Sequence, residues 1–130
     1  MSLSNSFFKE IGVQEEIGVR VTSVIDDLLE KGGNRPIDIQ LVSEKSGIPG
    51  STVKQIFFAY LTLQMLKGTF LPIHRKCGEP VGTQETSVAA ILEKAKKGRF
   101  GDLCFKCHDP IEGQKDVEIQ IIFWKPGTNV

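Results

Sequence analysis

The sequence has few of the residues from which common enzyme sites are built. Its 130 residues include only two histidines, three cysteines and one tryptophan. It contains no glycine-rich phosphate loop, no nucleophile elbow and no metalloprotease motif. We therefore expect a protein that is not an enzyme and that has no small-molecule substrate.

Long apolar runs are also absent. No stretch approaches the roughly 18 apolar residues of a membrane span, and the N-terminus lacks the pattern of a signal peptide. Three cysteines are an odd number, which does not suit a disulfide framework. We therefore expect a cytoplasmic chain without membrane contact, whose thiols are available to a metal.

A net charge of one sign is missing as well. The chain carries 16 basic and 16 acidic side chains, which argues against strong non-specific adhesion to nucleic acid or anionic membrane. Residues 51–100 nevertheless carry eight basic and three acidic side chains, a balance of +5 between two acidic flanks. This segment forms either a basic face on a neutral molecule or ordinary solvated surface.

Apolar residues of the first half recur at helical spacing. The spacing predicts helices over residues 15–31, within residues 37–46 and over residues 51–66, the third one capped by Ser51 or Thr52. Residues 47–50, Gly-Ile-Pro-Gly, predict a tight turn between the second and third helices, because glycine tolerates a positive φ. Together these features form a helix-turn-helix pattern.

The passage LVSEKSGIPGSTVKQIFFAYLTLQMLKG resembles the second and third helices of winged helix-turn-helix regulators. The resemblance covers about residues 15–75. It implies a recognition-type helix at residues 51–66, followed by a β-hairpin wing that begins with a strand at residues 69–73. The same three-helix scaffold serves DNA regulators, RNA-polymerase-associated subunits and protein-interaction modules.

The second half mixes strand-like and helical patterns. It predicts a helix over residues 84–97, capped by Thr83 or Thr86, and strands over residues 100–105 and 117–124. We expect the α+β class and one domain, a winged helix elaborated with a zinc-binding β-element and an extra helix. Its parts are an unassigned arm (1–14), the winged-helix core (15–73), a zinc-knuckle region (74–125) and a tail (126–130).

Two short passages mirror each other, PIHRKCGEPV at residues 72–81 and LCFKCHDPI at residues 103–111. Each holds two soft metal ligands separated by two residues, with a proline three residues after the second ligand. The pairs are His74 with Cys77, and Cys104 with Cys107. A tight turn with this spacing aims both side chains at one ion, and two facing turns complete a tetrahedron.

These passages resemble the knuckles of zinc ribbons, which read CxxCG and CxxC. His74 replaces the first cysteine, and Gly78 keeps the small turn residue. The predicted helix between the knuckles departs from a minimal ribbon. Three thiolates and one imidazole leave no open position, so we expect a structural Zn²⁺ site in which metal binding is coupled to folding.

Several alternatives stand beside this prediction. His108 competes as the fourth ligand, but neighbouring residues such as Cys107 and His108 seldom both reach one ion with good geometry. The cysteines could instead be buried small hydrophobic residues. Residues 104–108 also match the c-type haem attachment pattern, without the secretory signal that would support it. Iron is an alternative to zinc.

If the helix-turn-helix reads DNA, the N-terminal part of its third helix enters the major groove. Lysine can reach guanine, glutamine can pair with adenine, and hydroxyl groups suit phosphates or bases. The basic residues of the first knuckle would contact the DNA backbone or the minor groove. The candidate contacts are Ser51, Thr52, Lys54, Gln55, Arg75 and Lys76. We therefore expect a transcriptional regulator that binds double-stranded DNA.

One feature of the third helix favours a different class of protein. Residues 56–66 are apolar almost all round, whereas a helix that faces DNA keeps a polar side. The N-terminal arm, the zinc-bound segment or a second protein chain must cover the excess apolar surface. A homodimer or another protein partner would do so, and the rival function is a protein-interaction module, an adaptor or subunit of a larger complex.

Overall fold

The computed structural model describes residues 5–129, which form two compact units. The first unit comprises residues 5–67 and 123–129, and the second comprises residues 68–122. The described residues contain five α-helices, one short 3-10 helix and a two-stranded antiparallel sheet, so the predicted α+β class is confirmed.

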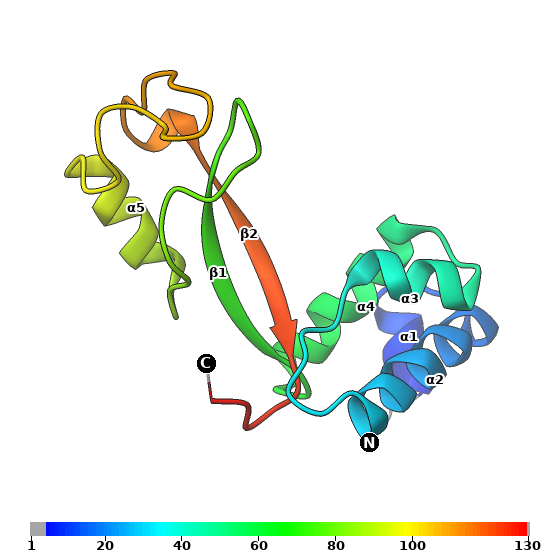
Figure 1. Ribbon diagram of the computed structural model, residues 1–130. Coiled ribbons are helices and arrows are strands. Elements are labelled where there is room, and N and C mark those ends of the chain that lie inside the picture. Colours follow the sequence, from blue (N-terminus) through cyan, green and yellow to red (C-terminus); the bar gives the residue numbers. More distant parts are fainter. Residues whose placement is uncertain (1–4, 130) are drawn as a thin grey trace. The chain divides into compact units, whose positions relative to one another are not determined.

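Three helices build the core of the first unit (Figure 1). They are α2 (Glu15–Lys31), α3 (Ile39–Ser46) and α4 (Gly50–Thr62), and α2 packs against both of the others. Their facing side chains are almost fully buried, among them Val21, Ile25, Val42, Ile56 and Phe57. The predicted bounds of α2 are confirmed at both ends.

The turn between α3 and α4 is held by backbone geometry and by the side chains of Ser43 and Ser46, the second of which accepts from the Ile48 amide. Gly47 adopts a φ of +72°, and the Ser43 hydroxyl donates to the Ile48 carbonyl at 2.6 Å. Helix α4 begins at Gly50 after Pro49, and no side chain caps it. The prediction that Ser51 or Thr52 would be the cap is therefore wrong, because both lie inside the first turn of the helix.

Helix α4 ends at Thr62, four residues before the predicted end. The helix stops because Gln64 adopts a left-handed φ of +58°, and the amides of Met65 and Leu66 both turn back to the Tyr60 carbonyl. This turn leads directly into strand β1 (Lys67–His74), which is longer than the predicted segment 69–73.

Strand β1 pairs with β2 (Val117–Trp124), whose predicted bounds are confirmed. Ile37, which lies between α2 and α3, adds an antiparallel bridge to Phe123 near the end of β2. The Phe123 ring meets Phe57 of α4 edge to face, with ring centroids 4.9 Å apart. From α2 onward, the chain order is therefore helix, one-residue bridge, helix, helix, strand, long connection and strand.

The long connection contains α5 (Val88–Lys96) and the short 3-10 helix η1 (Gln114–Asp116). Helix α5 starts later than predicted, because Ser87 rather than Thr83 or Thr86 is its cap and accepts the Ala90 amide. The predicted strand over residues 100–105 is also wrong. Within it only Leu103 forms a bridge, to Pro110, because the chain turns at Cys104.

A small apolar core supports this connection. Its buried members are Ile91, Ala95, Cys104, Ile111 and Val117. The knuckle cysteines are thus part of the core of the second unit, not an addition to its surface.

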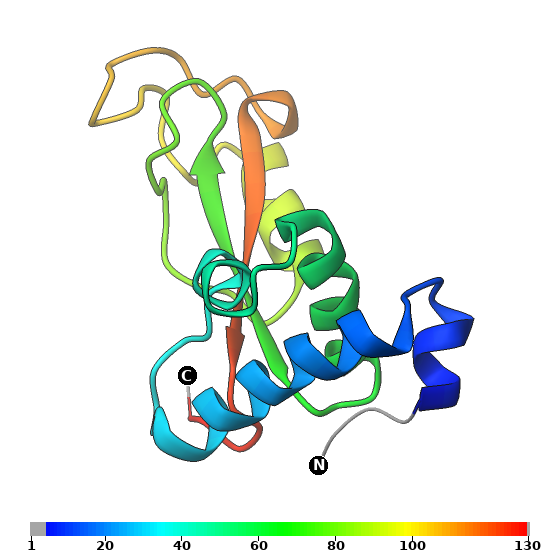
Figure 2. The same ribbon diagram turned by 90° about the vertical axis from the view of Figure 1, so that its right-hand side faces the viewer.

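The N-terminal arm, which the sequence left unassigned, contains α1 (Asn5–Glu10) beside the start of α2 (Figure 2). Phe8 is 1% exposed and packs against Gly18 of α2. Residues 1–4 of the arm lie outside the described residues. Among the described helices, none is both long enough and apolar enough to cross a membrane.

Candidate metal centre

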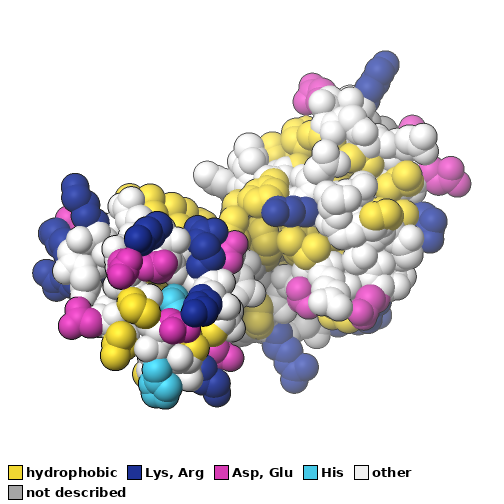
Figure 3. Space-filling model, turned by 90° about the horizontal axis from the view of Figure 1, so that it is seen from above, with side chains coloured by type: hydrophobic (Ala, Val, Ile, Leu, Met, Phe, Trp, Pro, Cys, Tyr) yellow, Lys and Arg dark blue, Asp and Glu magenta, His cyan; other side chains and the backbone are white. Residues whose placement is uncertain are grey.

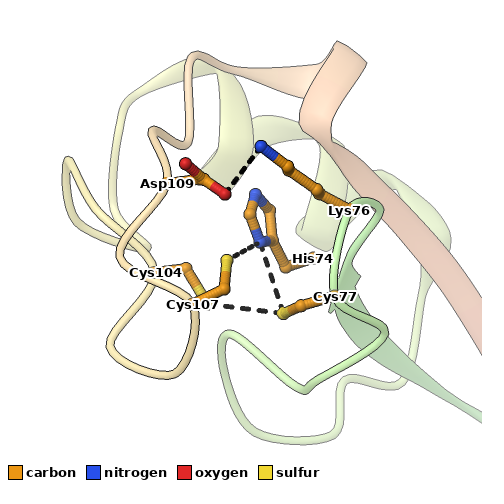
Figure 4. A network of polar contacts seen from close by, with 6 residues as sticks. All are labelled: His74, Lys76, Cys77, Cys104, Cys107 and Asp109. Carbon is orange, nitrogen blue, oxygen red and sulfur yellow. Dashed lines mark hydrogen bonds and ion pairs between the residues drawn. The ribbon is translucent and has the colours of Figure 1, made fainter.

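Four predicted ligands meet in the second unit. His74 lies at the end of β1, Cys77 in the turn that follows it, and Cys104 and Cys107 in the second knuckle. Their ligand atoms all lie within 4.8 Å of one another, and these residues could hold a metal ion. Figure 4 shows the three sulfurs and one imidazole nitrogen pointing toward a common centre.

Three of the six separations between these atoms are close to those around a tetrahedral ion. Nδ1 of His74 lies 3.5 Å from the Cys77 sulfur and 3.3 Å from the Cys107 sulfur, and the Cys77 and Cys104 sulfurs are 3.7 Å apart. A tetrahedral Zn²⁺ with bonds of about 2.3 Å to sulfur and about 2.0 Å to nitrogen would separate two sulfurs by about 3.8 Å and sulfur from nitrogen by about 3.5 Å. The nitrogen of His74 that faces the sulfurs is therefore Nδ1.

The two knuckles repeat one backbone design. The amide of Gly78 donates to the carbonyl of His74 at 2.8 Å, and the amide of His108 donates to the carbonyl of Cys104 at the same distance. Gly78 and His108, each directly after a ligand, both adopt a left-handed φ, of +75° and +64°. The two matching sequence passages thus fold into turns of the same backbone conformation.

Backbone amides also act on the sulfurs. The amide of Cys107, with that of Lys106, donates to the Cys104 sulfur and lowers the pKa of that thiol to about 7. The amide of Asp109 lowers the pKa of Cys107, but burial and the nearby thiols of Cys77 and Cys104 raise it by more, so the net shift is upward. Neighbouring thiolates repel one another, so ionisation of one thiol disfavours ionisation of the next. A divalent cation between them would offset that repulsion.

The competing ligand His108 lies outside the cluster. Its side chain is exposed, and its left-handed backbone belongs to the turn that follows Cys107. The alternative that the cysteines are only small hydrophobic residues is disfavoured, because Cys77 and Cys107 are half-buried and their sulfurs lie close to Nδ1 of His74. All three cysteines are free thiols.

An ion pair joins the two knuckles beside the cluster. The ammonium of Lys76 lies 2.8 Å from a carboxylate oxygen of Asp109. The hydrogen bond from Lys76 lowers the pKa of Asp109, and the same contact raises the pKa of Lys76. Sequence reasoning missed this pair, because Asp109 carries no motif of its own and Lys76 was expected at DNA.

The six residues expected to contact DNA lie in different surroundings. On α4, Ser51, Lys54 and Gln55 are exposed, and Thr52 is half-buried. In the second unit, the guanidinium of Arg75 donates to the Lys115 and Val117 carbonyls, and Lys76 is bound to Asp109. Both knuckle cations are therefore engaged within the protein.

Several basic side chains of segment 51–100 form ion pairs with acidic side chains. Lys94 is paired with Glu85 and Lys97 with Glu93, in addition to the pair at Lys76. On the face that Figure 3 presents, basic side chains stand beside acidic ones. These pairs favour ordinary solvated surface over a basic face.

Comparisons of this chain with protein families, curated proteins and solved structures found no match. The candidate metal centre is therefore supported by its geometry alone. Three thiolates and an imidazole form a soft donor set that suits zinc or iron, and a full set of four protein ligands is typical of a structural site.

Proposed function

We propose that this chain is a zinc-stabilised winged-helix protein that binds double-stranded DNA through the start of α4 and regulates transcription. The order of its elements supports the winged-helix assignment. Three helices are followed by β1, which pairs with β2 after the long connection, and Ile37 adds a one-residue bridge to the β2 side of that pair. In this assignment β1 and β2 are the wing, and the zinc knuckles with α5 are an enlarged wing tip.

The exposed polar start of α4 carries the DNA-binding proposal. Ser51, Lys54 and Gln55 face solvent directly after the tight turn from α3, where a recognition helix presents its reading residues. Lysine can bind the O6 and N7 acceptors of guanine, and glutamine can pair with adenine. This half of the helix thus combines an exposed position with the right donors and acceptors.

The apolar residues of α4 argue less against DNA than their number in the sequence indicates. The core buries five of them, namely Val53, Ile56, Phe57, Ala59 and Tyr60. Leu61 is half-buried, and Phe58 has 36% of its surface exposed. Phe58 shares an open apolar hollow with Phe7 and Ile11 of the arm, so the arm supplies part of the cover that the sequence requires.

The zinc ion has a structural role in this proposal. With three thiolates and the imidazole of His74 bound, Zn²⁺ has no open position for water or substrate. It would tie the turn after β1 to the knuckle that precedes β2, and so close the wing tip.

A mobility shift with mixed duplex fragments tests the DNA proposal. The double variant Lys54→Glu with Gln55→Ala should weaken binding by about tenfold or more, because it removes two base-reading side chains and reverses one charge. The matched control is Lys125→Glu, which makes the same charge change at an exposed position beyond β2. If both variants lose the same DNA affinity, the interaction depends on charge without base contacts, and readout by α4 is contradicted.

A protein-interaction module is the second candidate, and two side chains on the second knuckle favour it. Phe105 is 76% exposed and Leu103 is 59% exposed, more than any other large hydrophobic residue among the described ones. Exposed apolar side chains on a rigid turn can anchor in the pocket of a protein partner. If zinc-loaded protein fails to shift DNA even at low salt, this candidate becomes the better account.

A further inference from the structure

We propose that Asp109 is a positioning residue of the metal centre, which fixes the ring of His74 so that Nδ1 faces the three sulfurs. This inference rests on the zinc site proposed above. Asp109 lies two residues after Cys107 in the second knuckle, whereas His74 belongs to the first. A contact between them would therefore join the knuckles in addition to the ion and the pair between Lys76 and Asp109.

The orientation of the His74 ring leads to this proposal. The ring is 1% exposed, and its Nδ1 is the atom near the Cys77 and Cys107 sulfurs. Figure 4 shows the other ring nitrogen directed toward the pair formed by Lys76 and Asp109. When Nδ1 binds a metal, the neutral ring keeps its proton on Nε2, which becomes a donor.

Only one member of that pair can accept a hydrogen bond from the N–H group at Nε2. A lysine ammonium has three donors and no acceptor, whereas a carboxylate has several acceptor sites. Asp109 can therefore accept from Nε2 of His74 with one lone pair while Lys76 occupies another. An outer partner of this kind fixes the tautomer and the ring orientation of a metal-binding histidine.

The ion pair also balances charge at the centre. Three thiolates, a neutral imidazole and a divalent ion sum to one negative charge, and the Asp109 carboxylate would add a second. Lys76 supplies a positive charge at 2.8 Å from that carboxylate. In this way Lys76 holds Asp109 in place and offsets its charge beside the cluster.

The first knuckle offers a matched control for Asp109. Glu79 lies two residues after Cys77, as Asp109 lies two residues after Cys107. The backbone bonds correspond as well, because the Glu79 carbonyl accepts from the His74 amide and the Asp109 carbonyl accepts from the Cys104 amide. Substituting either side chain leaves these backbone bonds available, so the two variants differ in what the side chain does.

The test is zinc affinity by competition with a chelator, combined with ¹⁵N NMR of the His74 ring in the zinc-loaded full chain. Asp109→Ala should bind zinc about tenfold more weakly, and its Nε2 proton should exchange faster with solvent. Asp109→Asn should recover part of both effects, because its amide oxygen still accepts. Glu79→Ala should match the wild type in both measurements.

A further variant separates the hydrogen bond from the ion pair. Lys76→Met removes the cation but leaves the carboxylate, so the Nε2 proton should remain protected. If Lys76→Met and Asp109→Ala give the same loss, or if Asp109→Ala leaves affinity and exchange unchanged, the positioning role is overturned. A wild-type chain that binds no zinc would instead overturn the metal centre itself, so the two failures can be told apart.

Discussion

His108 occupies a backbone position that suits glycine better than histidine. Its φ of +64° matches that of Gly78 at the equivalent place in the first knuckle. A left-handed φ destabilises a residue with a side chain by about 1–2 kcal/mol. Substitution by glycine removes this strain, but glycine loses more conformational entropy on folding, which offsets part of the gain. We expect His108→Gly to stabilise the zinc-loaded protein by about 0.5–1 kcal/mol in urea unfolding, with zinc stoichiometry unchanged.

The opposite change at the first knuckle is the control. Gly78→Ala introduces a side chain with no atom within 4 Å, so only the backbone conformation opposes it. It should destabilise the protein by about 1 kcal/mol. If His108→Gly instead loses its zinc, His108 rather than the backbone explains the result, and the assignment of His74 as the fourth ligand is wrong.

At the scale of residues, the sequence predicted which side chains would gather but not their surroundings. The spacing of His74, Cys77, Cys104 and Cys107 was sufficient, because each pair lies within one tight turn. The pair between Lys76 and Asp109 joins the same two turns, but it could not be predicted, since no motif marks either residue as a partner of the other. The sequence gives the sign of the charge on Lys76 and Asp109, but it does not show that these two side chains are partners.

At the scale of elements, the docking of α1 on α2 depends on one missing side chain. A Cβ atom added at Gly18 would lie 2.6 Å from the ring of Phe8. Gly18→Ala should therefore destabilise the protein by about 1–2 kcal/mol in urea unfolding, because overpacking exceeds the gain in helix propensity. Gly50→Ala is the control, since nothing lies within 4 Å of its added Cβ, and it should be neutral or slightly stabilising.

Equal stability of Gly18→Ala and wild type would mean that Phe8 does not occupy this place on α2. The arm was beyond sequence reasoning, because Phe7, Phe8 and Ile11 show no period long enough to assign a helix. The end of α4 was missed for the opposite reason. Leu63 and Leu66 continue the apolar period of the helix, but Gln64 turns the chain toward β1, where pairing with β2 determines its path.

At the scale of the whole molecule, the two units should respond differently to removal of the metal. The first unit has a core of large apolar side chains from three helices, including Ile25, Phe57 and Tyr60. The buried core of the second unit is small and includes the candidate ligand Cys104. Since binding of a structural zinc supplies folding free energy, a chelator should unfold the second unit first.

Amide hydrogen exchange followed by mass spectrometry measures this difference directly. After chelation, peptides from residues 68–122 should lose protection, including those of α5, while peptides from α2 and α4 should keep theirs. Added Zn²⁺ should restore the loss, whereas Mg²⁺ should not, because Mg²⁺ prefers oxygen ligands to thiolates. Unchanged protection in both units would mean that the metal does not stabilise the fold. Loss in both would mean that the helical core depends on the metal centre as well, because nothing else distinguishes the two samples.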